Sequence, residues 1–254
     1  MRPAVIVASV LTAACLALTG CASAATTPDG SSTAPAASSA APAAGAAISI
    51  YYPVAVGNTW VYSIDYGNGM VVTDTEVMTK VTPEGGGTRA TIERTFTWND
   101  KSQPELMDSV EYVFGSDGSL TVPFQSLPIA GGGTVTVKSG ELVWPTSAEF
   151  EAGTAKTGII EASIDSNGTT TEQTVKFTIT GSGVESVTVP AGTFSARKLL
   201  QNLLISLPSL GVTDLPIDSV SWLAEDVGAV RTEIPDQSGG PTIVEQLLSF
   251  TPGR

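Results

Sequence analysis

The side chains of this sequence that could do chemistry are mostly carboxylates, because the chain has no histidine and only two cysteines. Without an imidazole base a Ser-His-Asp triad cannot form, and zinc sites are built mainly from His and Cys. Paired carboxylates can hydrolyse glycosides, but Glu225-Asp226 are adjacent and so face opposite sides of a strand. The stretch 165–172 lacks the residue order of a calcium loop. We therefore expect no enzyme, no cofactor and no metal site.

Arg94 is the charged residue in the most unusual position. It lies between Ile92 and Phe96 on an otherwise apolar strand face. A buried charge needs a partner, because its desolvation is otherwise uncompensated. Two interpretations stay open: Arg94 anchors the acidic head of a ligand, or it is held in a salt bridge or at a barrel rim.

An apolar stretch at residues 199–210 is the other candidate for binding. It is rich in leucine without clean alternation, which indicates a buried strand that runs into a loop broken by Pro208, Gly211 and Pro216. We expect the binding surface for an apolar or amphiphilic ligand around this loop, at Leu204, Leu207, Leu210 and Leu215.

The N-terminus combines one basic residue, Arg2, with an apolar stretch at residues 3–18. This stretch is shorter than the roughly 20 residues of a membrane-spanning helix. It ends in Leu18-Thr19-Gly20-Cys21, which resembles the signal of bacterial lipoproteins, whereas Cys15 has Thr12 three places before it. The resemblance implies that residues 1–20 are removed and that Cys21 carries acyl chains such as palmitate. Two or more chains hold a protein lastingly on a membrane, here on the extracytoplasmic face.

Without residues 1–20, the chain has 25 acidic and 11 basic residues, because Arg2 leaves with the signal. Such a surface repels nucleic acid and gains nothing from anionic headgroups, so the lipid must supply the attachment. Residues 21–48 begin with Cys21 and otherwise contain little but Ala, Ser, Thr, Pro and Gly. This composition is typical of a disordered tether, which would span on the order of 30 Å.

Residues 49–254 are predicted to form one all-β domain, because apolar residues alternate through most of them. Glycine-rich turns such as 66–69 and 83–87 join successive stretches and make them antiparallel neighbours. We expect about ten strands in a curved meander that forms a barrel or half-barrel, with a short helix at most in 147–156. The alternating stripes are Trp60, Tyr62, Ile64 and Tyr66; Val71, Thr73, Thr75, Val77, Thr79 and Val81; Ala90, Ile92, Arg94, Phe96 and Trp98; Val110, Tyr112 and Phe114; Ile160, Ala162 and Ile164; and Val175, Phe177 and Ile179.

Three stretches, at residues 52–62, 187–194 and 222–231, resemble a family of exported β-rich bacterial proteins of unassigned function. More loosely, a lipidated curved sheet is similar to the envelope lipid carriers of the LolA, LolB and LppX type, although this chain lacks their clear helices. That similarity implies a concave face that holds acyl chains. The leading hypothesis is therefore a non-enzymatic module that binds a lipid or other hydrophobic molecule. The alternative is a structural or assembly protein that binds another envelope protein.

Overall fold

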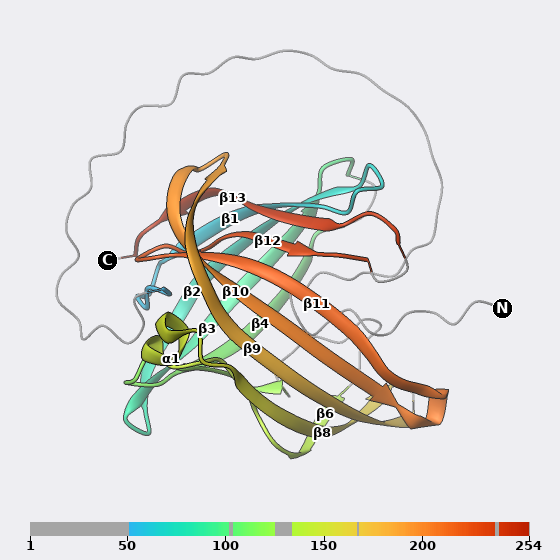
Figure 1. Ribbon diagram of the computed structural model, residues 1–254. Helices are drawn as coiled ribbons and strands as arrows, with labels where there is room; N and C mark the ends of the chain where they lie inside the picture. The colour runs from blue at the N-terminus through green and yellow to red at the C-terminus, as the bar shows by residue number, and fades with distance from the viewer. Residues whose placement is uncertain (1–50, 102–103, 125–133, 167, 237–238, 254) are drawn as a thin grey trace.

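The computed structural model describes residues 51–254, apart from residues 102–103, 125–133, 167, 237–238 and 254 (Figure 1). The predicted signal, Cys21 and tether lie outside the described residues. The described part forms one antiparallel sheet of thirteen strands with one short helix and one 3-10 turn. In chain order these are β1 (Thr59–Asp65), β2 (Val71–Glu84), β3 (Gly87–Trp98), β4 (Leu106–Phe114), β5 (Leu120–Val122), β6 (Thr134–Ser139), β7 (Leu142–Val143), α1 (Ser147–Ala152), β8 (Lys156–Ser166), β9 (Thr169–Val189), β10 (Gly192–Leu207), η2 (Pro208–Leu210), β11 (Val212–Ala224), β12 (Gly228–Ile234) and β13 (Ile243–Thr251).

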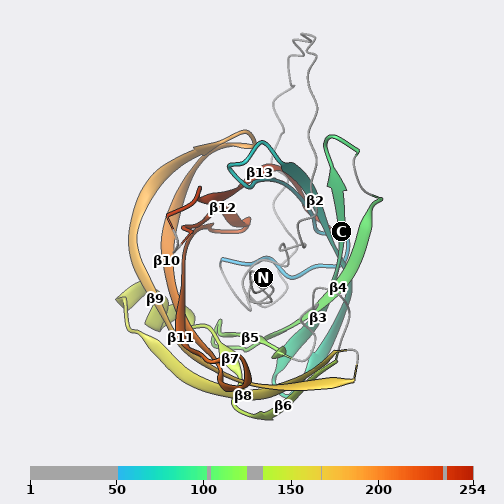
Figure 2. The ribbon, with the colours of Figure 1, turned by 90° about the vertical axis from the view of Figure 1, so that its right-hand side faces the viewer.

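The sheet curves round without closing. Its strand order is β6-β8-β9-β10-β11-β12-β13-β1-β2-β3-β4-β5-β7, so β1 and β13 are neighbours while β6 and β7 are the two edges. Figure 2, which looks along the barrel, shows the sheet bending through most of a circle. The predicted all-β half-barrel is confirmed, with thirteen strands in place of about ten. The difference is understandable because strands as short as β5 and β7 leave too few alternating positions to be read from sequence.

Alternation in the sequence becomes burial on one face of each strand. On β1 the side chains of Trp60, Tyr62 and Ile64 are buried, and on β3 the buried face runs from Thr88 through Arg94 to Trp98. The predicted stripes on these two strands are therefore the core-facing ones. On β2 the buried side chains are not those of the Val71–Val81 stripe but those of the opposite face. That face includes Asp74 and Glu76, so two carboxyl groups lie in the interior.

The predicted helix is α1, which ends at Ala152 because Gly153 follows in the left-handed region, with φ 68°. Its first turn is a capping box, in which Thr146 Oγ1 accepts from the Glu149 amide and the Glu149 carboxylate accepts from the Thr146 amide. Phe150 is buried against β9, where a Cβ on Gly181 would lie 1.9 Å from the Phe150 carbonyl oxygen. A glycine at this point of β9 is what allows the helix to close onto the sheet.

The three stretches that carry the family resemblance meet at one end of the barrel. Trp60 Nε1 donates to the Val227 carbonyl at 2.6 Å, and the Tyr62 hydroxyl donates to the Ala229 carbonyl at 3.1 Å. The β9–β10 turn contacts β13, because the Ala191 amide donates to the Leu247 carbonyl at 3.0 Å. Residues far apart in the sequence thus close this end of the sheet together.

The interior contains two separate apolar clusters. The larger one includes Trp60, Met78, Ile92 and Leu199, and the smaller one consists of Ile64, Val72, Phe96 and Trp98. Among the residues that the structure describes, no helix has the length and apolar character needed to cross a membrane.

Candidate functional site

A set of charged side chains lies between the two apolar clusters on the inner face. We call Asp74, Glu76, Arg94, Asp108 and Glu245 the Arg94 cluster. Glu76, Arg94 and Asp108 are direct partners in the register of β2, β3 and β4, and Glu245 of β13 is the partner of Ile64 on β1. The sheet therefore brings together one guanidinium and four carboxyl groups from four strands.

Local sequence explains why these charges meet at one level of the barrel. On β2 the inner face reads Val72, Asp74, Glu76 and Met78, so two acids lie between an apolar residue of each cluster. On β3 the same level holds Arg94, between an apolar residue on either side. Because residues paired across an antiparallel ladder point to the same side, the polar positions fall next to one another.

Arg94 is buried and paired with two acids. Its Nη2 donates to Oδ2 of Asp74, and its Nε lies 2.9 Å from Oε1 of Glu76 without the alignment of a hydrogen bond. The Arg94 guanidinium carbon also stands 4.7 Å from the centre of the Phe96 ring. The structure thus shows Arg94 in a salt bridge, the second interpretation of the sequence, and its role as a ligand anchor stays a prediction.

Glu245 lies in the same interior without a partner. It is 7% exposed, and it makes no hydrogen bond or ion pair with any residue that the structure describes. Oδ1 of Asp74 and Oδ1 of Asp108 are also buried without a hydrogen-bond partner among the described residues. The cluster therefore has more acceptors than its single guanidinium satisfies.

Burial changes the protonation of these acids. Desolvation raises the pKa of Glu76 to about 7 against the opposing effect of Arg94, and raises the pKa of Asp108 to about 6. It raises the pKa of Glu245 to about 8, to which the negative charges of Glu76 and Asp74 add. Burial also raises the pKa of Asp74, again against Arg94. Near neutral pH the cluster therefore holds protons on some of its carboxyl groups.

Tyrosines line the interior around the cluster. Burial, followed by the charge of Glu76, raises the pKa of Tyr52, Tyr62 and Tyr112 above the usual value, so all three stay neutral phenols. The Tyr52 ring lies 6.1 Å from that of Tyr112 and 5.5 Å from that of Phe114, between their centres. The charged groups thus face an aromatic wall with polar edges.

Polar residues continue across the neighbouring strands. Thr232 of β12 is the register partner of Glu245, and Ser219 of β11 is the partner of Gln201 on β10. Gln201 and Ser219 are buried, and neither Nε2 of Gln201 nor Oγ of Ser219 has a hydrogen-bond partner among the described residues. A band of polar groups, several of which have an unmet hydrogen bond, therefore crosses the inner face from β4 to β10.

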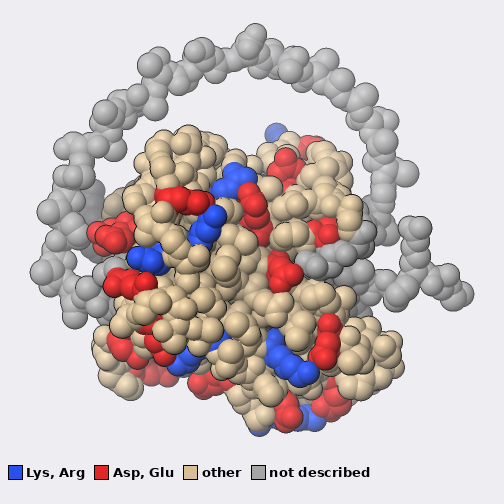
Figure 3. Space-filling model, in the orientation of Figure 1, with Lys and Arg blue, Asp and Glu red and all other residues tan. Residues whose placement is uncertain are grey.

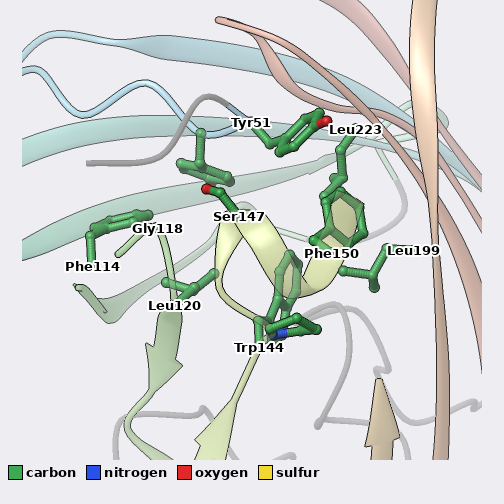
Figure 4. Close-up of a pocket in the computed structure, with 11 residues that line it drawn as sticks. Tyr51, Phe114, Gly118, Leu120, Trp144, Ser147, Phe150, Leu199 and Leu223 are labelled. Atoms are coloured by element: carbon green, nitrogen blue, oxygen red, sulfur yellow. The ribbon is translucent and has the colours of Figure 1, made fainter. Parts of the chain in front are cut away.

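A small apolar pocket lies beside α1 (Figure 4). In the close-up, Phe150 projects from the helix toward Leu199 and Leu223, with Tyr51 across from them. The volume of this pocket is about 30 Å³. That volume suits about one water molecule, so the pocket as it stands is too small for an acyl chain.

A larger groove, of about 340 Å³, lies at the end of the barrel near the β9–β10 turn. Its lining includes Tyr51, Val184, Phe194, Arg197 and Glu225. The Arg197 side chain is engaged there, because Nε donates to the Tyr51 hydroxyl and Nη1 donates to the Ser182 carbonyl, both at 3.1 Å.

The four predicted leucines do not form one surface. Leu207 is buried in the larger cluster, and Leu215 is the register partner of buried Ile205 and shares its inner face. Leu204 is half-buried on the outer face, and Leu210 is 57% exposed in η2. The expected strand and loop are present, since β10 ends at Leu207, but the strand divides the leucines between its two faces.

Sequence reasoning found Arg94 and missed the acids around it. Asp74 and Glu76 alternate with Val72 and Met78, but the stripe of valines and threonines on the other face of β2 is equally regular. Glu245 gave no signal, because its place depends on the pairing of β13 with β1. In the part of the chain that the structure describes, no group of three or more Asp, Glu, Cys or His is arranged to hold a metal ion.

The chain belongs to the DUF3108-like family. The model of that family matches residues 57–243, which include nearly the whole sheet. No curated protein matches the sequence at a significant level. The expectation of a family with a β-rich domain is therefore supported, while the export of its members and the looser similarity to LolA-type carriers stay predictions.

Two solved structures share the fold. One is a proposed lipoprotein from Parabacteroides distasonis, with 16% identity, coverage of 80% of this chain and 99% of the other, and a TM-score of 0.60. The second is a proposed exported protein with a YmcC-like fold from Bacteroides fragilis, with 13% identity, coverage of 80% and 100%, and a TM-score of 0.55. At such identities the likeness concerns the fold alone.

Proposed function

We propose that this chain is an exported lipoprotein whose β domain binds an amphiphilic ligand, without catalysis, on the inner face of its open sheet. The lipoprotein signal at residues 18–21 and the exported or lipoprotein character proposed for its structural relatives support this location. The acyl chains on Cys21 would hold the protein on the extracytoplasmic face of a membrane.

The anchor can be tested by metabolic labelling with a clickable palmitate analogue. The wild-type chain incorporates the label and sediments with membranes, and Cys21→Ser abolishes both. Cys15→Ser is the matched control, because it removes the other cysteine and leaves the lipoprotein signal intact. Label that persists in Cys21→Ser would show that Cys21 is not the lipidated residue.

One observation carries the binding proposal: unmet polar atoms lie on the inner face next to apolar side chains. Ser219, Gln201 and Asp74 each have a buried polar atom without a hydrogen-bond partner among the described residues. Each such atom destabilises a folded protein by about 1–3 kcal/mol unless something pairs with it. An amphiphile has both a polar head for the band and an apolar part for the clusters beside it.

The site differs from the predicted loop. Of the predicted binding residues, Arg94, Leu207 and Leu215 face the interior. The two leucines can provide apolar contacts to a ligand there. Leu204 and Leu210 lie outside it, on the outer face of β10 and in η2. Because the pocket beside α1 is small, a bound acyl chain would have to push the strands apart or displace side chains.

Native mass spectrometry of the full-length protein, purified from membranes in a mild detergent, tests the proposal. We expect one amphiphile per chain, and we expect Gln201→Leu to lower its occupancy because the band loses an amide. Gln246→Leu is the matched control, since Gln246 is next to Glu245 on β13 but lies opposite Ser63 on the outer face. A protein that carries no ligand but captures one envelope protein would instead favour the structural or assembly role.

A further inference from the structure

We propose that the head group received by the Arg94 cluster is a cation with N–H donors, such as an alkylammonium, and this inference rests on the proposed function. The cluster contains four carboxyl groups and one guanidinium, so it is short of positive charge. Arg94 compensates Asp74 and Glu76, and neither Asp108 nor Glu245 has an ion-pair partner among the described residues.

The unpartnered Glu245 side chain points independently to a ligand. It is more than nine-tenths buried, and it faces the cluster, because its carboxyl group interacts electrostatically with Glu76, Asp74 and Arg94. Native proteins pair their buried polar groups almost without exception. A carboxyl group kept in this position without a partner is therefore suited to a cation from outside the chain, which favours the ionised form of the carboxyl group.

The cluster atoms that lack a hydrogen-bond partner among the described residues also favour a positively charged head group over a negatively charged one. Among the acids these are the Oδ1 atoms of Asp74 and Asp108, and carboxylate oxygens accept hydrogen bonds. A carboxylate or phosphate head would add acceptors and negative charge to a site that has too many of both. Arg94 alone would attract an acidic head, but two acids already hold it.

The neighbouring residues fit the apolar part of such a molecule. Val72, Phe96 and Trp98 belong to the smaller apolar cluster directly beside the charges, and half-buried Met70 packs against that cluster. The aromatic faces of Phe96 and Trp98 also favour a cation over an anion. The occupant is therefore an organic cation with a hydrocarbon body.

Isothermal titration of the full-length protein in a non-ionic detergent, near pH 7, tests this inference with three probes of equal chain length: octylammonium, octyltrimethylammonium and octanoate. We expect octylammonium to bind about tenfold more tightly than octanoate, a difference of about 1.4 kcal/mol. We expect octyltrimethylammonium to lie between them, because it is a cation without N–H donors. Titration into empty detergent micelles gives the blank.

Glu245→Gln localises the effect, because glutamine keeps the shape of the protonated side chain but cannot ionise when a cation binds beside it. We expect it to weaken octylammonium binding about tenfold and to leave octanoate unchanged. Glu93→Gln is the matched control, since Glu93 is exposed on the outer face of β3 beside Arg94. Equal binding of octanoate and octylammonium, or no effect of Glu245→Gln, overturns the cationic head and leaves amphiphile binding intact. If none of the probes binds, the inference is overturned, and native mass spectrometry decides separately whether the proposed function falls with it.

Discussion

Two arginines on β3, Arg89 and Arg94, make the same kind of contact in two environments. Each is paired with two carboxylates: Arg89 with Glu84 and Glu111, and Arg94 with Asp74 and Glu76. The Arg89 side chain is 30% exposed, and that of Arg94 is 4% exposed. The two residues are an odd number of positions apart, so the pleat of the strand places one outside and one inside.

The difference shows that burial decides whether the pKa of a carboxyl group paired with arginine is lowered or raised. On the outer face, the hydrogen bond from Arg89 lowers the pKa of Glu84, so the charged form of Glu84 is favoured. Inside, desolvation outweighs Arg94 and raises the pKa of Glu76 to about 7. The face in Figure 3 shows acidic and basic side chains interspersed on the surface, where water solvates whatever they leave unpaired. Groups of the Arg94 cluster lack that compensation.

The largest effect that would test this comparison is the loss of Arg94. We expect Arg94→Met to lower the free energy of unfolding by about 3–5 kcal/mol, because it leaves Asp74 and Glu76 buried without a cation. Urea denaturation followed by tryptophan fluorescence measures it. The same substitution at Arg89 is the control, and equal effects at the two positions would break the comparison.

Replacing the whole buried set separates loss of charge from loss of packing. The combination of Arg94→Met, Asp74→Leu and Glu76→Met keeps similar volumes and removes the three paired charges. We expect it to recover most of the stability that Arg94→Met loses, because apolar replacement of a buried ion pair is often neutral or stabilising by about 1–4 kcal/mol. The urea midpoint of the triple variant checks this. A triple variant no more stable than Arg94→Met would place the loss in packing rather than charge.

The pH dependence of stability follows from the raised pKa values inside. Glu76 and Glu245 have folded-state pKa values of about 7 and about 8, above their ordinary value of 4.5. The folded chain thus binds more protons than the unfolded chain between these limits, so their stabilising contribution is complete below pH 4.5 and is lost as the pH rises through 7 and 8. We expect urea denaturation at about pH 5 to give a free energy of unfolding higher by a few kcal/mol than at about pH 8.5.

Surface acids change stability in the opposite direction and in another range. The pKa values of Glu84, Glu149 and Asp214 are lowered by hydrogen bonds, chiefly from Arg89, Thr146 and Lys176 respectively. Their stabilising contribution is present above the ordinary carboxyl pKa and is lost as the pH falls through the lowered values. Because that range lies below pH 5, a stability that rises steadily from pH 5 to pH 8.5 would instead show that the buried acids of the Arg94 cluster do not have raised pKa values in the folded protein.

Glu245→Gln gives a smaller and more local effect. Because glutamine cannot ionise, we expect the variant to lose the part of the pH dependence that centres on about 8 and to gain stability at about pH 8.5. Urea midpoints at both pH values measure the change against wild type, with Glu93→Gln as the exposed control. An unchanged pH profile would mean that Glu245 ionises freely in the folded protein.

The sequence predicted what depends on neighbours along the chain. Alternation gave an all-β curved sheet, and Arg94 stood out because it interrupts an apolar stripe. The partners of Arg94 were not predictable, because the two faces of β2 alternate equally well and only the packed sheet decides which turns inward. The role of Glu245 was still harder to predict, because its position follows from the pairing of the last strand with the first. The family stretches gave no sign of the cluster, although Trp60 and Tyr62 of the first stretch are the register partners of Glu76 and Asp74, because that pairing joins two different strands.

The smallest effect is expected at Arg89, and it is the sharpest check on the comparison. Arg89→Ala removes contacts to Glu84 and Glu111, yet all three side chains are partly exposed and water replaces the lost hydrogen bonds. Exposed ion pairs contribute little or nothing measurable, and salt screens what remains. We expect the urea midpoint of Arg89→Ala to stay within the scatter of the wild-type measurement, and any difference to shrink in about 1 M salt. A loss as large as that of Arg94→Met, insensitive to salt, would mean that the geometry of the pair matters more than the medium around it.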